Sequence, residues 1–155
     1  MNRLEQLQQI VNDMIQELPD VEIRQKAYTH SYGVSQASAL LAARRGINPE
    51  LAAVCGLLHD LYAYQVGTYE NHHVGGAVLA EEILTSVDLF NSNEIETVKA
   101  AIQHHDDRHL VHSPYDEVLK DADILQPYLN KLIKPSSPHA ADRLSNMLKE
   151  LHIVG

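Results

Sequence analysis

The sequence contains few of the residues on which many folds depend. It has no Trp, one Phe and one Cys in 155 residues, and aromatic residues make up only 5% of the chain. A core without large aromatic side chains must be built from Leu, Ile, Val and Ala, and this composition favours close helix packing over a sheet. The single cysteine, Cys55, excludes an intrachain disulfide and fits a reducing compartment.

Long apolar runs and positive charge are also scarce. No run of about 18 apolar residues occurs, and the first residues lack the apolar stretch of a signal peptide, so we expect a cytoplasmic protein. Twelve Lys and Arg residues stand against 21 Asp and Glu, which gives a formal net charge of −9. This charge argues against a nucleic-acid duplex or an anionic membrane as a partner. A small anionic substrate remains compatible if cations in the site offset the repulsion.

Apolar residues recur at helical spacing along most of the chain. Three- and four-residue steps predict helices over residues 3–18, 20–45, 48–60, 71–84, 93–105, 115–133 and within 135–155. Asn93 is the expected cap of the fifth helix, and Pro127 is expected to interrupt or bend the sixth. Residues 62–70 and 106–114 are expected as connections. We therefore expect one all-α domain over residues 1–155, a bundle of about six to seven helices.

Several of the ten histidines interrupt the apolar stripes of these helices. His30 lies within the second stripe, and the pair His59-Asp60 ends the third. The pair His72-His73 opens the fourth helix, and His105 ends the stripe of the fifth. A lone histidine on such a stripe is more often a core residue bonded to a backbone carbonyl. Because four helices each turn an imidazole inward, a shared metal site in the bundle core explains the pattern better.

The ligand types restrict the metal. Imidazole and carboxylate suit Mn²⁺, Fe²⁺, Ni²⁺, Co²⁺ or Zn²⁺, with Mg²⁺ as a further option, and fit neither an all-thiolate zinc site nor an all-oxygen calcium site. Periodicity favours His105 over His104 as a ligand, because His105 continues the apolar stripe of its helix. It leaves His72 and His73 as equal alternatives.

The order of these residues resembles the signature of the HD superfamily of metal-dependent phosphohydrolases. That signature is a histidine on a helix, an adjacent His-Asp pair and a later aspartate, which would be His30, His59-Asp60 and Asp123 here. Periodicity does not separate Asp121 from Asp123, since Asp121 lies on the apolar stripe of its helix. The segment Ala122-Asp123 is similar to the Ala-Asp segment of the family and favours Asp123.

The resemblance covers about residues 25–130 and includes a second set of ligands. Family members with two metals have a histidine four residues before Gly-Ala and another that ends Ile-x-x-His. His72 precedes Gly76-Ala77 by four residues, and His105 ends the second pattern. The resemblance thus implies one or two divalent ions, with Asp60 as the bridge between them. The implied metal ligands are His30, His59, Asp60, Asp123, His72 and His105.

The resemblance also implies a reaction. It implies that water activated at the metal cleaves a phosphoester or phosphoanhydride bond of a small phosphorylated, nucleotide-like substrate, with Asp60 and His59 as catalytic residues. Candidates for contact with the substrate phosphate are His104, Arg108, His112 and Lys120, each with the alternative of a solvated or surface residue. The family branch that cleaves dinucleoside polyphosphates has a Thr-x-Gly-Arg-like continuation after the second-metal histidine, which is absent here. The Gly-Tyr-Pro segment of the cyclic-dinucleotide branch is also absent after His104-His105.

Two further hypotheses compete with the enzyme. A non-catalytic helical module that binds metal or nucleotide would carry the same ligands, and a metal-free bundle with hydrogen-bonded core histidines would need none. No nucleic-acid duplex or membrane partner is expected under any of the three. The substrate, the native metal, the general acid and the oligomeric state, with a homodimer as one option, stay open.

Overall fold

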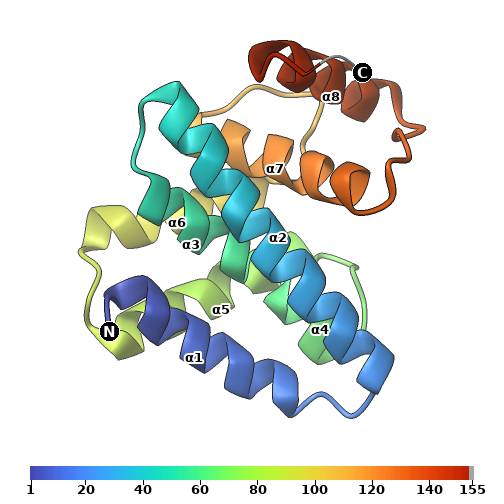
Figure 1. Cartoon of the computed structure of the whole chain (residues 1–155). Helices are drawn as coiled ribbons and strands as arrows, with labels where there is room; N and C mark the ends of the chain where they lie inside the picture. Colours follow the sequence, from blue (N-terminus) through green and yellow to red (C-terminus); the bar gives the residue numbers. More distant parts are fainter. Residues whose placement is uncertain (154–155) are drawn as a thin grey trace.

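The computed structural model describes residues 1–153 as a bundle of helices with no strand among them (Figure 1). The all-α class expected from the composition is confirmed. No helix within the described residues is long and apolar enough to cross a membrane. The helices are α1 (Arg3–Gln16), α2 (Val21–Arg45), α3 (Pro49–Leu58), α4 (Leu61–Val66), α5 (His72–Val87), α6 (Ser92–His104), α7 (Pro114–Lys131) and α8 (Pro138–Glu150).

Local sequence signals set most of the helix ends. Asn48 caps α3 ahead of Pro49, and Gly46 ends α2 with a φ of 75° in the left-handed region. The start of α6 differs from the expectation, because Asn91 rather than Asn93 is the cap. Asn91 and Glu94 form a reciprocal capping box, which satisfies two backbone N–H groups at once.

A short helix, α4, occupies part of the expected connection over residues 62–70. It has only six residues, too few for an apolar period to be recognised in the sequence. Leu61 and Tyr64 are nevertheless buried, and they anchor α4 to the core. Because α4 starts directly after Asp60, the chain changes direction at the His59-Asp60 pair.

The helix α7 continues through Pro127, so the chain is not interrupted there. Proline lacks an N–H and cannot complete the helical hydrogen bond to the carbonyl of the residue four positions earlier. That residue is Asp123, so Pro127 lies one turn from an expected metal ligand. The helix packs against α2 and α6.

The long helix α2 crosses the bundle and packs against both α3 and α7 (Figure 1). Its contact with α3 is close at Gly56, where an added Cβ would lie 2.7 Å from the Val34 carbonyl oxygen and 2.8 Å from Ser35 Cα. Only glycine fits such an approach of two helix backbones. This crossing brings the C-terminal end of α3, with His59, next to His30 on α2.

The last helix, α8, packs against α7 and is joined to the bundle by ion pairs. Arg143 on α8 contacts Asp121 at 3.0 Å and Glu117 at 3.1 Å. Arg45 at the end of α2 contacts Asp121 at 2.6 Å and Glu150 at 3.0 Å. Asp121 is therefore engaged by two arginines on the side of α7 that faces α8.

Candidate metal centre

Five helices and the turn before α4 bring the six expected ligands together. They come from segments that are far apart in the sequence, and five of the six are buried. The positions are His30 within α2, His59 and Asp60 between α3 and α4, His72 as the first residue of α5, His105 just after α6, and Asp123 within α7.

Four of these residues form the first ligand set. His30 Nε2 lies 3.2 Å from His59 Nε2 and 3.0 Å from Asp123 Oδ1. Asp60 Oδ2 is 3.3 Å from the Nε2 atoms of both histidines, and His59 Nε2 is 3.2 Å from Asp123 Oδ1. A divalent cation about 2.1 Å from each of its ligands leaves neighbouring ligand atoms about 3 Å apart, so these distances suit one ion.

Asp60 also belongs to a second ligand set, through its other oxygen. Asp60 Oδ1 lies 3.2 Å from His72 Nε2 and 3.5 Å from His105 Nε2. The two Nε2 atoms are 3.0 Å apart. The carboxylate therefore presents one oxygen to each set, which is the arrangement a bridging ligand requires.

Backbone carbonyls orient three of the histidines. In each case the ring Nδ1–H donates to the carbonyl oxygen three residues earlier, which leaves Nε2 with a lone pair directed into the cluster. These bonds are His59 to Gly56 at 2.7 Å, His72 to Tyr69 at 2.7 Å, and His105 to Ile102 at 2.5 Å.

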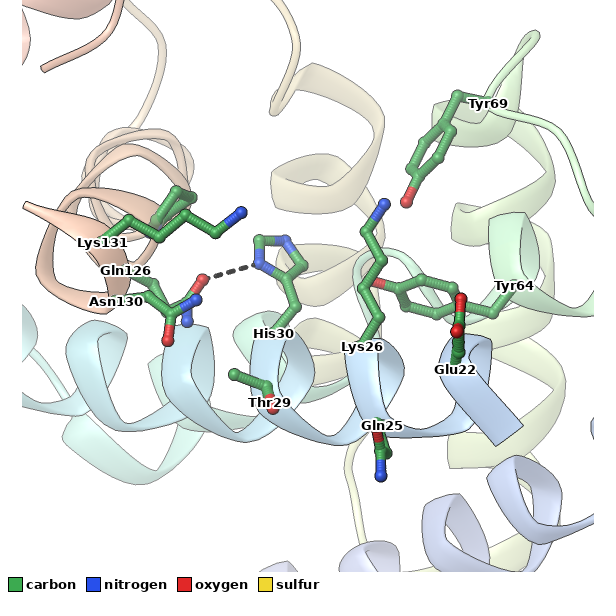
Figure 2. Close-up of a pocket in the computed structure, with 11 residues that line it drawn as sticks. Glu22, Gln25, Lys26, Thr29, His30, Tyr64, Tyr69, Gln126, Asn130 and Lys131 are labelled. Carbon is green, nitrogen blue, oxygen red and sulfur yellow. Dashed lines mark hydrogen bonds between the residues drawn. The ribbon is translucent and has the colours of Figure 1, made fainter. Parts of the chain in front are cut away.

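His30 is oriented by a side chain instead. Its Nδ1–H donates to Gln126 Oε1 at 2.9 Å (Figure 2). Gln126 is in turn held against Gly33, where an added Cβ would lie 2.5 Å from Gln126 Cγ. Gln126 was not predicted as a site residue. Its position three residues after Asp123 on the same helix is the only sequence signal that points to it.

The chemistry of the converging atoms fits a bound cation. Asp60 Oδ1 is buried and has no hydrogen-bond partner among the described residues. In the neutral tautomer set by the carbonyls, the facing Nε2 atoms of His72 and His105 are acceptors as well. A cluster of buried acceptors about 3 Å apart is costly unless a cation or added protons lie between them. The residues present therefore fit one divalent ion in each set.

When no metal is bound, protons on the histidines offset the cost of the buried acceptors, and the pKa values reflect this. Burial lowers the pKa of His30, but the carboxylates of Asp123 and Asp60 outweigh it and raise the value to about 9. The pKa of His59 is also raised, since Asp60 and Asp123 overcome its burial. Burial raises the pKa of both carboxyls, yet the adjacent histidines bring each of them well below its usual range. The first ligand set thus holds protons on His30 and His59 at neutral pH when no metal is bound.

We therefore expect metal binding to compete with these protons. Because an imidazole must be neutral to bind a metal, the proton on His30 weakens the apparent affinity at every pH below about 9. Each such proton lowers the affinity by about tenfold per pH unit. Calorimetric titration with Mn²⁺ in buffers of different ionisation enthalpy measures the protons released. An affinity that is flat from pH 6.5 to 9, with no proton release, would contradict the assignment.

The neighbours of the expected ligands have other contacts. Asp121 pairs with Arg45 and Arg143, whereas Asp123 faces the cluster. His72 lies against His105. His73 stands beside this cluster, in a more exposed group with His72 and Asp106.

Of the four phosphate candidates, Arg108 is the one that lies beside the metal centre. Its Nη2 donates to Asp123 Oδ2 at 3.0 Å. Arg108 also lines a cavity of about 400 Å³ into which His30, Asp60, His72 and His105 open. Its guanidinium therefore stands at the mouth of the metal centre.

The other three phosphate candidates form a separate cluster between the loop after α6 and α7. His104 donates to Asp116 at 2.6 Å and stacks on His112, with ring centroids 4.0 Å apart. Lys120 is fully buried and contacts His112 Nδ1 at 2.7 Å and Glu117 at 2.7 Å. None of the three lines the cavity at the metal centre.

Asp106 is a site residue that the sequence pattern placed in a solvated loop. Its Oδ2 lies 3.6 Å from His72 Nε2, and its Oδ1 lies 3.6 Å from His105 Nε2. The side chain is 48% exposed, so it stands at the rim of the same cavity. The only local signal was its position directly after His105.

Comparison with known proteins identifies a family and a similar fold. The family model of the HD domain matches residues 27–128. No curated protein matches the chain significantly. The crystal structure of a predicted HD superfamily hydrolase from an uncultured Thermotogales bacterium is similar, with a TM-score of 0.63 and 20% identity over 98% of this chain and 96% of that one. At this identity the likeness concerns the fold. With the family match over most of its length and His/Asp clusters suited to divalent metals, the chain belongs to the HD domain family of metal-dependent hydrolases.

Proposed function

We propose that the protein is a phosphohydrolase that cleaves a phosphoester or phosphoanhydride bond of a small, nucleotide-like phosphorylated substrate. The observation that carries the proposal is the pair of ligand sets joined by Asp60, which open to a cavity beside Arg108. At such a site two divalent ions supply activation of water and neutralisation of the charge on phosphorus. Hydrolysis of a phosphoryl group depends on both effects.

The protein's own residues have distinct roles in this proposal. Asp60 fixes the two ligand sets relative to each other, because it offers one oxygen to each. His59 is a ligand of the first set, and the Gly56 carbonyl fixes its orientation. Arg108 is the positioning and charge-stabilising group for a phosphate oxygen in the cavity. It also offsets the net charge of −9 at the point where an anion enters.

The ring nitrogens of the ligand histidines are excluded as proton donors to the leaving group. The Nδ1–H groups of His59, His72 and His105 are engaged by backbone carbonyls, and that of His30 is engaged by Gln126 Oε1. The exposed carboxyl group of Asp106 at the rim is free of that restriction and lies beside His72 and His105. We assign to Asp106 the exchange of a proton with water or with the leaving oxygen.

A turnover screen tests the proposed function. Protein loaded with Mn²⁺ is incubated with bis(p-nitrophenyl) phosphate and with a panel of nucleotides, and released p-nitrophenol, nucleoside and phosphate are measured. We expect turnover of at least one substrate that disappears on chelation and returns when Mn²⁺ is restored. Tight nucleotide binding without turnover by fully loaded protein would identify the non-catalytic module instead. Protein that is purified without transition metal and binds none would exclude the phosphohydrolase and favour the metal-free bundle.

A further inference from the structure

A second cavity opens beside the metal centre. Its volume is about 520 Å³, which lies within the range of small-molecule sites. It shares His30, Tyr69 and Pro127 with the cavity at the metal centre, so the two cavities are adjacent. A substrate held at the metals would extend into this second cavity.

Two lysines stand on either side of His30 in this cavity (Figure 2). Lys26 lies one turn before His30 on α2, and Lys131 is the last residue of α7. Figure 2 shows both ammonium groups directed to the same side of α2 as the His30 ring. We call the space between Lys26, Lys131 and His30 the lysine pocket.

Neither lysine has an ion pair with any residue of the described chain, although acidic residues outnumber basic ones. The cavity has one carboxylate, Glu22, which lies a further turn away from His30 and makes no ion pair with Lys26 within 4 Å. Two ammonium groups without partners on an acidic protein raise the local concentration of anions.

We propose that the lysine pocket binds a second phosphoryl group of the substrate while the phosphoryl group to be cleaved lies at the metal centre. This inference rests on the proposed function and narrows its substrate class to small molecules with two separated phosphoryl groups. Lys26 and Lys131 act as point charges on the second group. A monophosphate would reach the metals and leave the pocket without a ligand.

Hydrolysis-resistant ligands test the inference by binding alone. Isothermal calorimetry on Mn²⁺-loaded protein compares methylphosphonate with a series of alkane-α,ω-bisphosphonates of increasing chain length, whose C–P bonds the reaction does not cleave. We expect at least one bisphosphonate to bind roughly tenfold or more tightly than methylphosphonate, a difference of about 1.4 kcal/mol or more. We expect Lys26→Met/Lys131→Met to remove this gain and to leave the affinity for methylphosphonate within about threefold.

The matched control is Lys134→Met/Lys149→Met. These exposed lysines line a different cavity, beside α8, and the control removes the same two charges. It should keep the bisphosphonate gain. A gain that is equal in both double variants, or no bisphosphonate that binds more tightly than methylphosphonate, would overturn the inference. If the protein hydrolyses phosphoesters but binds no bisphosphonate more tightly than methylphosphonate, this inference alone is wrong. If bisphosphonates bind more tightly in a lysine-dependent way but no substrate is hydrolysed, only the proposed function is wrong.

Discussion

Asp60→Asn is expected to abolish hydrolysis and to remove most of the bound metal. Among the described residues, Asp60 alone belongs to both ligand sets, with Oδ2 facing His30 and His59 and Oδ1 facing His72 and His105. Loss of a residue that merely supports a ligand costs about 10- to 100-fold in metal affinity or activity, so loss of the shared ligand should exceed about a hundredfold. Elemental analysis and turnover measure the two effects.

Asp142→Asn is the matched control for this substitution. Asp142 lies exposed on α8, outside both ligand sets, and the same change there should leave metal content and turnover within about twofold of wild type. The Asn variant keeps the shape of the side chain, so circular dichroism should show the native helix content. A folded Asp60→Asn protein with full metal content and full turnover would disprove the mechanism.

Removal of metal is expected to destabilise the whole fold. The ligands lie on α2, α5 and α7 and around the ends of α3 and α6, so a bound ion joins helices that are otherwise held by packing. At a metal concentration about 100 times Kd, binding contributes about 2.7 kcal/mol. For a chain of this size that corresponds to roughly 5–10 °C in Tm. Calorimetric unfolding with and without chelator measures the difference.

The stability of the metal-free protein and the affinity for metal depend on pH in opposite directions. In the metal-free protein the raised pKa of His30 gives stability that is fully present below about pH 6.5 and is lost as the pH rises through about 9. Metal binding strengthens over the same interval, because the proton leaves the ligand. The Tm difference should therefore widen from pH 6.5 to 9. Equal Tm values with and without chelator throughout this range would favour the metal-free bundle.

The helices were predictable because their signals are local. Capping residues such as Asn48, glycine at position 46 and the spacing of apolar side chains act within one or two turns. The exceptions have local causes as well. The helix α4 is too short to show a period, and Asn91 rather than Asn93 caps α6 because Glu94 completes the box.

The inward-facing histidines were predictable for the same reason, but their partners were not. Periodicity could not separate His72 from His73 or Asp121 from Asp123. In the fold, His72 meets His105, and Asp121 is held by Arg45 and Arg143 on the opposite side from the cluster. Contact between helices decides such pairs, and helical period alone does not contain that information.

By itself, the sequence determined the class of fold, the positions of most helices and the kinds of ligand available, since each follows from spacing, caps and side-chain chemistry. Only the tertiary structure decided that the two oxygens of Asp60 face different ligand sets and that Gln126 orients His30, from which it is 96 residues distant in the sequence. It also placed Lys26 and Lys131 beside the same cavity. These are distances through space between remote segments, and the packing of α2 against α3 and α7 sets them.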